Sequence, residues 1–426
     1  MNIGFLGLGK LGLPVALAIE SKGHKVFGHD INDQTLRNIR FKTLNYKEKG
    51  AQELLNKSKI EIKNIEQIVS NSDIIFVPIQ TPHEEKYEGI TRIPKERADF
   101  NYEYLIKGIK DLNKEIEKQG KDKIVVIIST VLPGTIRKHI KPILSKHLKL
   151  CYNPYFIAMG TTIDDFLNSE IILFGVDDKE AANKAKKFYK TINKSPFHET
   201  TIENAELIKV VYNTFISTKI SMINTIMETC HNLPNTNVDD ITKALSLCTD
   251  RIISSKYLKG GMGDGGGCHP RDNIALSYLA QKLNLSYNWY DNIMKQREKQ
   301  TDWLADIIMT EKFEMDINIL GKCFKPETNL TLGSPSLLLK NILEERGEKV
   351  KIWDPYVDSI DMENVSKEME WETKPQLFFI GTKHEAFKHF YFYPNSVVID
   401  PFRYLKLGDD VKYIPIGDNT WKQKTE

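Results

Sequence analysis

Cys268 is the residue whose surroundings best suit nucleophilic chemistry. It ends a loop with six glycines between Gly260 and Gly267, and the sequence HPRD (269–272) follows it directly. Proline suits the first turn of a helix, and the pattern up to residue 283 would continue that helix. A thiol at the positive end of a helix is favoured as the thiolate, which is the attacking species. We therefore interpret Cys268 as a nucleophile; an ordinary thiol beside a flexible loop is the alternative.

Four polar side chains form a second candidate group. Residues 203–229 contain no glycine or proline and carry apolar side chains on several faces, which predicts a long, buried helix. At about 100° per residue, one face of that helix holds Lys209, Asn213, Ser217 and Asn224. Buried polar groups need partners. A substrate and a reacting oxyanion would supply them, whereas a neighbouring helix or water is the alternative.

The N-terminal segment suits the binding of a dinucleotide. A short apolar strand runs into three spaced glycines, and an apolar helix and a second strand follow, ending at Asp30. In such a βαβ unit the first glycine allows a tight turn, the second lets a pyrophosphate approach the backbone, and the third lets helix and strand pack. The acid would bind a ribose 2′-hydroxyl and repel a 2′-phosphate, so we expect NAD as the cofactor. The candidate cofactor residues here are Gly7, Gly9, Lys10, Leu11, Gly12 and Asp30.

Further strand patterns alternate with helix patterns in the N-terminal half. The runs at 73–82 and 123–135 predict strands, and 101–116 predicts a helix between them. This alternation predicts a mostly parallel sheet, beyond whose carboxyl edge ligands bind. Thr81 and Thr130 would lie at that edge as cofactor contacts; a hydroxyl bonded within its own turn is the alternative. The charged segment between Pro82 and Phe100 predicts an exposed excursion.

Length and composition limit the class of protein. At about 150 residues per domain, 426 residues suggest two or three domains. Lys+Arg 59 against Asp+Glu 57 leaves a net charge of +2, which gives no field for nucleic acid or an anionic membrane. No apolar run reaches the ~18 residues of a spanning helix, so we expect a cytoplasmic protein. Widely spaced cysteines without CxxC pairs argue against disulfides and a structural metal. The remaining cysteines are expected to be small buried or neutral residues: Cys151, Cys230, Cys248 and Cys323.

A second strand-helix-strand pattern fills the C-terminal part. It comprises the runs at 317–326, 334–347, 350–356, 377–387 and 396–402. The expected fold class is therefore α/β, with two Rossmann-like parallel-sheet domains joined by a helical middle domain with a long central helix. The expected boundaries are 1–200 for the NAD-binding domain, 201–300 for the central helical domain, 301–420 for the C-terminal α/β domain and 421–426 for a disordered tail.

Seven ordered blocks resemble the UDP-glucose/GDP-mannose dehydrogenase family over nearly the whole chain. They are GLGKLGLP, STVLPGT, NPYF, AELIKVVYN, GGGCHPRD, GKCFKPET and VKIWDPY. The resemblance implies an enzyme that oxidises the C6 alcohol of a nucleotide-linked sugar to a carboxylate with two NAD+ in succession. It also implies that the C-terminal domain binds the nucleotide sugar, and that the long middle helix forms a homodimer.

The resemblance further implies roles for individual residues. Cys268 would add to the aldehyde intermediate, giving a thiohemiacetal and then a thioester that water hydrolyses. Lys209 and Asn213 would donate to the developing oxyanion. Asp272, one helical turn beyond Cys268, would orient or activate water, and Thr130 would position it. The expected substrate-binding residues are Tyr155, Lys209, Asn213, Arg251, Lys259, Gly265, Lys325 and Arg403, of which Arg251 would cross to the other subunit's sugar site.

Several positions depart from the family pattern. Two glutamates of the family are Tyr155 and Met159 here, and a phenol with a pKa of about 10 is a poor base at neutral pH. Thioester hydrolysis would then depend on another group, Asp272 first, or would be slower or different. The other departures are Arg271 for a lysine, Leu332 for an arginine that reaches the cofactor, and Arg403 moved one residue outward.

Two alternatives to a four-electron nucleotide-sugar 6-dehydrogenase remain. A two-electron oxidoreductase, such as a 3-hydroxyacid dehydrogenase, needs the cofactor turn and the helix lysine but no nucleophile, so Cys268 argues against it. A non-catalytic sensor of NAD or of a nucleotide sugar needs no catalytic set. The presence together of Lys209, Asn213, Cys268 and Asp272 argues against that alternative.

Overall fold

The computed structural model describes residues 1–249, 254, 256–257, 259–282, 288–358, 371 and 373–418. The chain divides into two compact units. Unit 1 comprises Met1–Pro82 and Asp99–Tyr212, and unit 2 comprises His83–Ala98 and Asn213–Glu426. Arg251 and the expected tail at 421–426 lie outside the described residues. The domain boundaries near 200, 300 and 420 stay a prediction.

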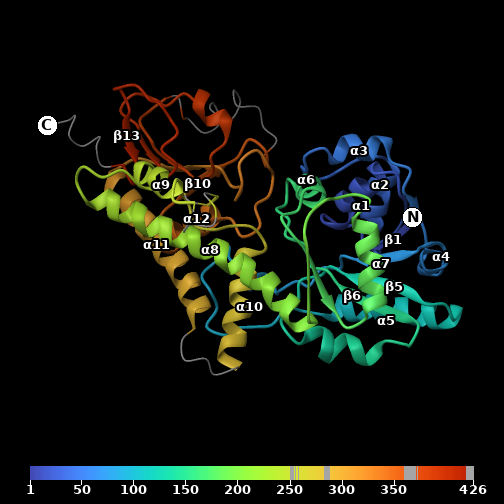
Figure 1. The fold of residues 1–426 in the computed structure, drawn as a ribbon. Helices are drawn as coiled ribbons and strands as arrows, with labels where there is room; N and C mark the ends of the chain where they lie inside the picture. The colour runs from blue at the N-terminus through green and yellow to red at the C-terminus, as the bar shows by residue number, and fades with distance from the viewer. Residues whose placement is uncertain are drawn as a thin grey trace. The chain divides into compact units, whose positions relative to one another are not determined.

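Unit 1 is built on a mostly parallel sheet (Figure 1). Its strands are β1 (Asn2–Leu6), β2 (Lys25–His29), β3 (Glu61–Ile62), β4 (Ile74–Val77), β5 (Lys123–Ile127), β6 (Leu148–Tyr152), β7 (Ile172–Val176) and β8 (Phe197–Thr200). They lie in the order β3-β2-β1-β4-β5-β6-β7-β8, and only β6 and β7 pair antiparallel. Its helices are α1 (Gly12–Ser21), α2 (Asp33–Arg40), α3 (Ala51–Lys57), α4 (Ile65–Asn71), α5 (Glu103–Gln119), α6 (Thr162–Leu167) and α7 (Lys179–Tyr189), with short turns η2 (Ile136–Ile140) and η3 (Lys141–Ile143). The long α8 (Ile202–Asn232) begins in unit 1 and ends in unit 2.

Both faces of this sheet are covered, which explains its sequence pattern. Ile3 and Phe5 of β1 point to the face where α1, α3, α6 and α7 pack. The residue between them, Gly4, faces α4, where an added Cβ would lie 2.9 Å from Ile68. Strands buried on both faces read as continuous apolar runs, as β4 and β5 do. The predicted alternating α/β pattern of the N-terminal half is confirmed.

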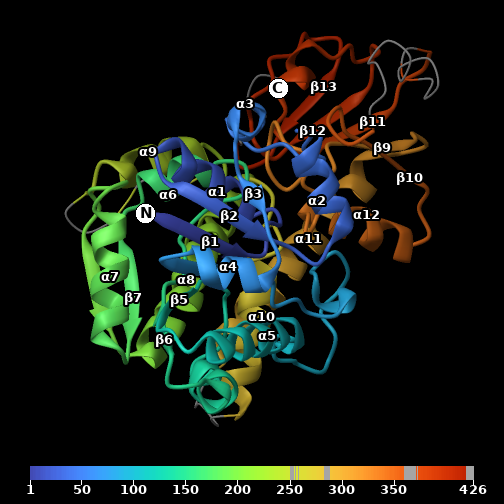
Figure 2. The ribbon, with the colours of Figure 1, turned by 90° about the vertical axis from the view of Figure 1, so that its right-hand side faces the viewer.

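Unit 2 contains a second, wholly parallel sheet. Its strands are β9 (Ile317–Leu320), β10 (Val350–Trp353), β11 (Leu377–Ile380), β12 (Val397–Asp400) and β13 (Lys412–Pro415), in the order β10-β9-β11-β12-β13. Its helices are α9 (Val238–Ser246), α10 (His269–Lys282), α11 (Trp289–Glu311) and α12 (Pro335–Glu345), with short turns η1 (Glu85–Tyr87) and η4 (Glu385–His389). Helices α11 and α12 pack on one face of the sheet (Figure 2), and a cluster of aromatic side chains covers the other. The second α/β pattern expected from the sequence is confirmed.

The segment His83–Ala98 is only in part the exposed excursion that its charges suggested. It belongs to unit 2, where Tyr87 is 3% exposed. Arg97 pairs with Asp291, and Arg92 pairs with Asp302 (2.8 Å), both of α11. The prediction holds for the exposed charges Glu84, Glu85, Lys86, Lys95 and Glu96. It was wrong for Tyr87, which is buried, and for Arg97, whose charge is matched by an acid of α11.

Two expectations from composition can be compared with the described residues. All five cysteines are described and free; Cys248 and Cys268 are exposed, and the others are buried. Of the four cysteines expected to be small buried or neutral residues, Cys248 is the one that is not buried. None of the helices in the described part of the chain has both the length and the apolar character that a membrane span needs.

Candidate active site

The glycine turn after β1 has the geometry that a dinucleotide needs. Gly7 has φ +113°, which only glycine adopts without strain. An added Cβ on Gly9 would meet no atom within 4 Å, whereas one on Gly12 would lie 2.3 Å from the Gly7 carbonyl oxygen. Room for a pyrophosphate therefore lies at Gly9, and close packing of α1 against the turn requires Gly12. These residues fit NAD, which would accept hydride when bound there.

Asp30 is held beside this turn by backbone donors. Its carboxylate accepts hydrogen bonds from the Leu8 N–H (2.7 Å) and the Asn32 N–H (2.8 Å). The side chain is only half-buried, so its remaining lone pairs stay available to ribose hydroxyls. Lys10 is exposed, and Leu11 precedes α1 as its N-cap residue.

Thr81 and Thr130 meet at the carboxyl edge of the sheet of unit 1. The Thr81 hydroxyl donates to the Thr130 carbonyl oxygen at 2.6 Å, so its partner is the neighbouring strand end rather than its own turn. The loop after Thr130 is fixed in turn by Glu206 of α8. That carboxylate accepts hydrogen bonds from the N–H groups of Gly134 (2.6 Å) and Ile136 (2.8 Å).

Lys209 lies in the same unit and is 7% exposed. Its ammonium group is 5.7 Å from the centre of the Phe156 ring, next to Tyr155 in the NPYF block. The Tyr155 hydroxyl accepts a hydrogen bond from the Tyr189 hydroxyl (2.9 Å). Burial raises the pKa of the Tyr155 phenol above its ordinary value. At neutral pH the phenol therefore stays protonated, in line with the expectation that it is a poor base.

Cys268 is exposed directly before α10, as the sequence predicts. Its carbonyl oxygen accepts the Asp272 N–H (2.8 Å), the first hydrogen bond of the helix. The glycines before it are packed rather than flexible. An added Cβ on Gly261 would lie 2.8 Å from Phe402, one on Gly265 2.5 Å from Phe324, and one on Gly267 2.5 Å from Leu332. Much of the loop, including Gly265, which we expected to bind substrate, is therefore packed against the chain's own side chains.

The polar stripe of α8 finds most of its partners within the chain. The Ser217 hydroxyl donates to Asp264 (2.9 Å), and the Asn224 side chain pairs with Gly261 N–H and Met262 carbonyl (3.1 and 3.3 Å). The stripe therefore anchors the glycine loop. This agrees with the alternative in which the chain itself, rather than a substrate, supplies the partners. Of the candidate catalytic residues, Asn213 hydrogen-bonds to Asp272.

Asp272 is fully buried in the first turn of α10. Besides Asn213, it accepts a hydrogen bond from the Arg271 guanidinium (Nε to Oδ1, 3.1 Å). Arg271, which stands where the family has a lysine, therefore helps to fix the neighbouring Asp272 carboxylate. A carboxylate held on both oxygens is well suited to fix a water molecule or a neighbouring donor.

Arg297 of α11 joins three loops of unit 2. It is 4% exposed, and its guanidinium donates to the carbonyl oxygens of Asp264 (2.9 Å), Gly89 (3.0 Å) and Gly333 (3.0 Å). It also forms an ion pair with the Asp264 carboxylate at 3.2 Å. The loop that bears Cys268 is thus held by a buried charge that no sequence pattern singled out.

The expected substrate residues of unit 2 differ in what they can still offer. Arg403 donates to both carboxylate oxygens of Asp239 and to the carbonyl oxygens of Pro401, Ile416 and Gly260, so its donors are engaged within the chain. Lys325 is half-buried and Lys259 is exposed. Leu332 is 45% exposed.

Cys323, Asp354 and His384 form a buried group with the chemistry of metal ligands. Their hydrogen bonds oppose metal binding. His384 Nδ1 accepts the Glu327 N–H (3.0 Å), so the proton of the neutral ring is on Nε2, which faces Asp354 (3.0 Å). A metal at Nε2 would need that nitrogen deprotonated, leaving no proton on the ring.

Three residues of these networks were missed by sequence reasoning. Arg297 and Glu206 lie on helices where a single buried charge has no distinguishing pattern. Glu48 is 7% exposed in a loop and accepts hydrogen bonds from Gly160 N–H (2.8 Å) and from Thr162, beside the position of Met159. For Glu206 there was one signal, its place within the AELIKVVYN block.

The fold and these sites define an NAD-binding α/β dehydrogenase with an exposed cysteine at a helix N-terminus. Residues 1–193 match the NAD binding domain of the UDP-glucose/GDP-mannose dehydrogenase family, and residues 203–298 match its central domain. The chain belongs to this family of NAD-dependent nucleotide-sugar 6-dehydrogenases.

Individual relatives agree with the family. The chain is 29% identical to the UDP-glucose 6-dehydrogenase of Rickettsia conorii over 381 residues, which cover 87% of this chain and 83% of that protein. A UDP-glucose dehydrogenase structure from Pyrobaculum islandicum has a TM-score of 0.84 at 23% identity, covering 98% of this chain and 97% of the other. A UDP-D-ManNAc dehydrogenase structure from Pyrococcus horikoshii has a TM-score of 0.81 at 23% identity, covering 99% and 100%. These structures share the predicted fold.

Proposed function

We propose that the protein oxidises the C6 alcohol of a nucleotide sugar, UDP-glucose or a related UDP- or GDP-sugar, to the carboxylate with Cys268 as covalent nucleophile. The observation that carries this proposal is the exposed Cys268 thiol at the N-terminus of α10, on a loop fixed by packing and by Arg297. A two-electron dehydrogenase would need no such cysteine. The family membership supports the substrate class.

The chemistry balances over two oxidations, in each of which one hydride would leave C6 for NAD+. In the first, C6 loses a hydride and its hydroxyl loses a proton, leaving an aldehyde. The Cys268 thiolate adds to the aldehyde carbon, and the alkoxide takes a proton to give a thiohemiacetal. Loss of a second hydride and a proton gives a thioester. Water then releases the carboxylate, and the sulfur leaves as thiol.

Within this scheme the polar residues have separate tasks. Lys209 and Asn213 donate to the oxyanion, and Thr130 positions water. Asp272 is the candidate that orients or activates water, because the Tyr155 phenol stays protonated. Hydrolysis of the thioester would then be slower than in enzymes with a glutamate at this position.

We further propose that the protein acts as a homodimer through α8. Four apolar side chains on this helix are 38% exposed or more: Leu207, Val211, Phe215 and Met222. Their spacing of four, four and seven residues puts them on one face, and an exposed apolar stripe of this kind suits a partner helix.

The deciding experiment incubates the protein with NAD+ and a panel of UDP- and GDP-sugars, and counts NADH formed per sugar consumed. Two NADH with release of the uronate support the proposal. One NADH with free aldehyde would indicate the two-electron alternative, and binding without any NADH would indicate a sensor.

A second measurement follows the covalent step. The Cys268→Ser variant should show no thioester adduct by intact-protein mass spectrometry under conditions in which the wild type, quenched in turnover, carries one. An unchanged yield of uronate from this variant would exclude covalent catalysis by Cys268.

A further inference from the structure

The loop after β9 has a strained backbone that needs support. This loop, residues 321–331, carries Lys325 and starts at Gly321, whose φ is +106°. Within it Glu327 has φ +59°, a left-handed conformation that costs a residue with a Cβ about 1–2 kcal/mol. The surrounding contacts must therefore stabilise this conformation specifically.

His384 provides two of these contacts from the end of β11. The side chain is fully buried. Its Nδ1 accepts the Glu327 N–H (3.0 Å), and its Nε2 donates to Asp354 Oδ2 (3.0 Å). The same Asp354 oxygen accepts the N–H groups of Lys322 (2.7 Å) and Cys323 (3.1 Å). The imidazole thus joins the beginning of the loop to its strained residue.

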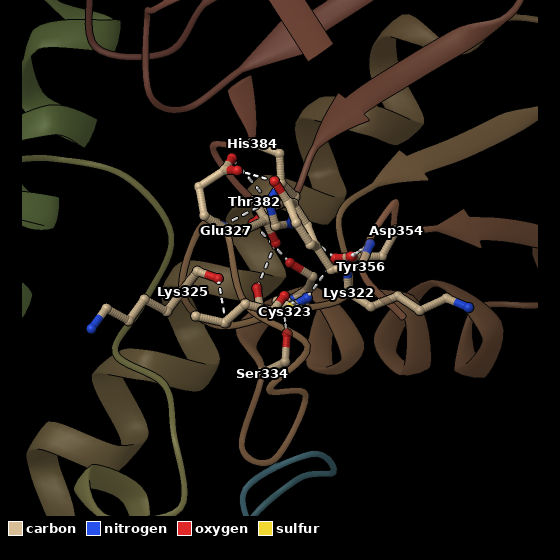
Figure 3. A network of polar contacts seen from close by, with 12 residues as sticks. Lys322, Cys323, Lys325, Glu327, Ser334, Asp354, Tyr356, Thr382 and His384 are labelled. Atoms are coloured by element: carbon tan, nitrogen blue, oxygen red, sulfur yellow. Dashed lines mark hydrogen bonds and ion pairs between the residues drawn. The ribbon is translucent and has the colours of Figure 1, made fainter. Parts of the chain in front are cut away.

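The Glu327 side chain completes the arrangement. Its carboxylate accepts the Glu385 N–H (2.8 Å) and a hydrogen bond from the Tyr356 hydroxyl. The Tyr356 ring packs on His384 with 4.9 Å between ring centres. Figure 3 shows these side chains converging on one side of the loop, whereas the Lys325 ammonium group points away from them. The network therefore holds the loop backbone, including the Lys325 carbonyl oxygen, which accepts the Thr328 hydroxyl (2.9 Å), while the Lys325 ammonium group points away (Figure 3).

The loops after β1 and β9 are held by the same pair of hydrogen bonds from backbone N–H groups to the end of the neighbouring strand. The acid in this arrangement, Asp30 or Asp354, has a different role in each unit. In unit 1 Gly7 N–H binds the His29 carbonyl and Leu8 N–H binds Asp30; in unit 2 Gly321 N–H binds the Trp353 carbonyl (2.6 Å) and Lys322 N–H binds Asp354. Asp30 is half-buried and open to a ligand, but Asp354 is fully buried and faces His384. Asp354 therefore serves to fix the conformation of the 321–331 loop.

We propose that His384 is a positioning residue for nucleotide-sugar binding: by joining Asp354 to Glu327, it holds the 321–331 loop in the shape that presents Lys325 to the substrate. This inference rests on the proposed function and on the expectation from the family resemblance that Lys325 contacts the nucleotide sugar.

Amide exchange tests the positioning step without any substrate. His384→Leu removes both hydrogen bonds, whereas the amide of His384→Gln still offers a donor near the position of Nε2 and an acceptor oxygen. Loss of one such bond should raise hydrogen exchange of the peptide covering 321–331 by about tenfold in His384→Leu, with His384→Gln close to wild type. Ile293→Ala, a cavity in the separate core cluster that Ile293 forms with Tyr87, Ile274 and Met294, is the control for general destabilisation. Unchanged exchange in His384→Leu, or an equal rise in Ile293→Ala, would overturn the proposal.

Steady-state kinetics test the link to binding. His384→Leu should raise KM for the nucleotide sugar by about tenfold or more while kcat and KM for NAD+ stay near wild type, and His384→Gln should restore KM. Glu327→Gly, which accepts φ +59° without strain and keeps the N–H, should raise KM less than His384→Leu. A fall in kcat with unchanged KM would refute the role in binding. A wild type that oxidises no nucleotide sugar would refute the proposed function, while the exchange result would still decide whether His384 shapes the loop.

Discussion

At the level of single residues, the ionisation of Glu206 should make the stability of the protein depend on pH. It is fully buried three residues before Lys209, and its carboxylate holds the loop after Thr130 through two backbone N–H groups. Burial raises its pKa from 4.5 to about 7, although the two backbone donors and Arg137 act in the opposite direction and Glu203 adds to the rise. The fold therefore prefers the protonated acid.

This preference predicts that unit 1 loses stability as the pH rises towards neutrality. The stabilisation from Glu206 is fully present below pH 4.5 and is lost as the pH passes through about 7, with a size of about 3 kcal/mol. In Glu206→Gln, urea unfolding measured from pH 5 to pH 8 should show a flatter dependence of the free energy of unfolding on pH. The exposed Glu117→Gln of α5, in the same unit, serves as the control. Equal slopes in Glu206→Gln and wild type would contradict the raised pKa.

Arg297 is a second residue that we expect to contribute strongly to stability, although no sequence pattern singled it out. Replacing it with methionine leaves Asp264 buried without its guanidinium and three carbonyl oxygens without donors. We expect a loss of about 3–5 kcal/mol in the free energy of unfolding, measured by urea denaturation. Asp264→Asn in the same chain should recover part of that loss. If Arg297→Met costs less than about 1 kcal/mol, the worth of a surface ion pair, the buried pair does not anchor the loop.

At the level of elements, the glycines of the two loops serve opposite purposes. The turn before α1 leaves space at Gly9, which a ligand can use. The loop before α10 uses its glycines to let other segments approach, at Gly261 and Gly265 among others. A count of glycines could not separate these two uses, because the difference lies in what each missing Cβ would meet.

The first turn offers a matched pair of substitutions. Gly9→Ala should leave the melting temperature near that of wild type but raise KM for NAD+ by about tenfold or more, on the order of the loss of one hydrogen bond to the pyrophosphate. Gly12→Ala should lower the melting temperature, because its Cβ would lie 2.3 Å from a backbone oxygen. Thermal unfolding and NAD+ titration distinguish the two. The reverse pattern would show that the turn does not face the cofactor.

The loop before Cys268 offers a second pair. Gly265→Ala should destabilise by about 1–3 kcal/mol because Phe324 Cβ and the Gly333 backbone surround the site. Gly267→Ala meets only the Leu332 side chain, which is 45% exposed and can move. Urea unfolding of both variants measures the difference. Equal stability of the two would indicate that the loop is loose.

At the level of the whole molecule, the chain passes between its units at three places. It enters unit 2 after Pro82, returns at Asp99 and enters again after Tyr212, in the middle of α8. Unit 2 is therefore incomplete without His83–Ala98, a segment from the N-terminal half. Neither unit is a continuous stretch of sequence, so cutting the chain near residue 200 would separate parts of one core.

The exposed stripe of α8 predicts the oligomeric state. Phe215→Arg combined with Met222→Arg should convert the proposed homodimer to a monomer, seen as a halved mass by light scattering, because two charges would enter the proposed apolar interface. The control is Phe313→Arg, which alters a side chain that is 83% exposed elsewhere in unit 2. A wild-type protein that is already monomeric at assay concentration would rule out the dimer.

The sequence by itself determined the fold class, the cofactor turn, the long helix and the position of Cys268 before α10. These features are local: they follow from periodicity, from glycine spacing and from the short distance between a loop and the helix it precedes. Family membership follows from the same ordered blocks, and the matches at 1–193 and 203–298 confirm it.

Only the tertiary structure decided which buried charges are paired and what the glycines touch. Arg92 and Arg97 looked solvated because their charges were counted without their partners on α11, which are far away in the sequence. The stripe of α8 looked like a ligand face because its partners, Asp264 and the glycine loop, are distant in sequence. The Asp354–His384–Glu327 network was not predicted for the same reason, because it joins three separate segments of the chain. Charge pairing and close packing depend on long-range contacts, and no local pattern of residues specifies them.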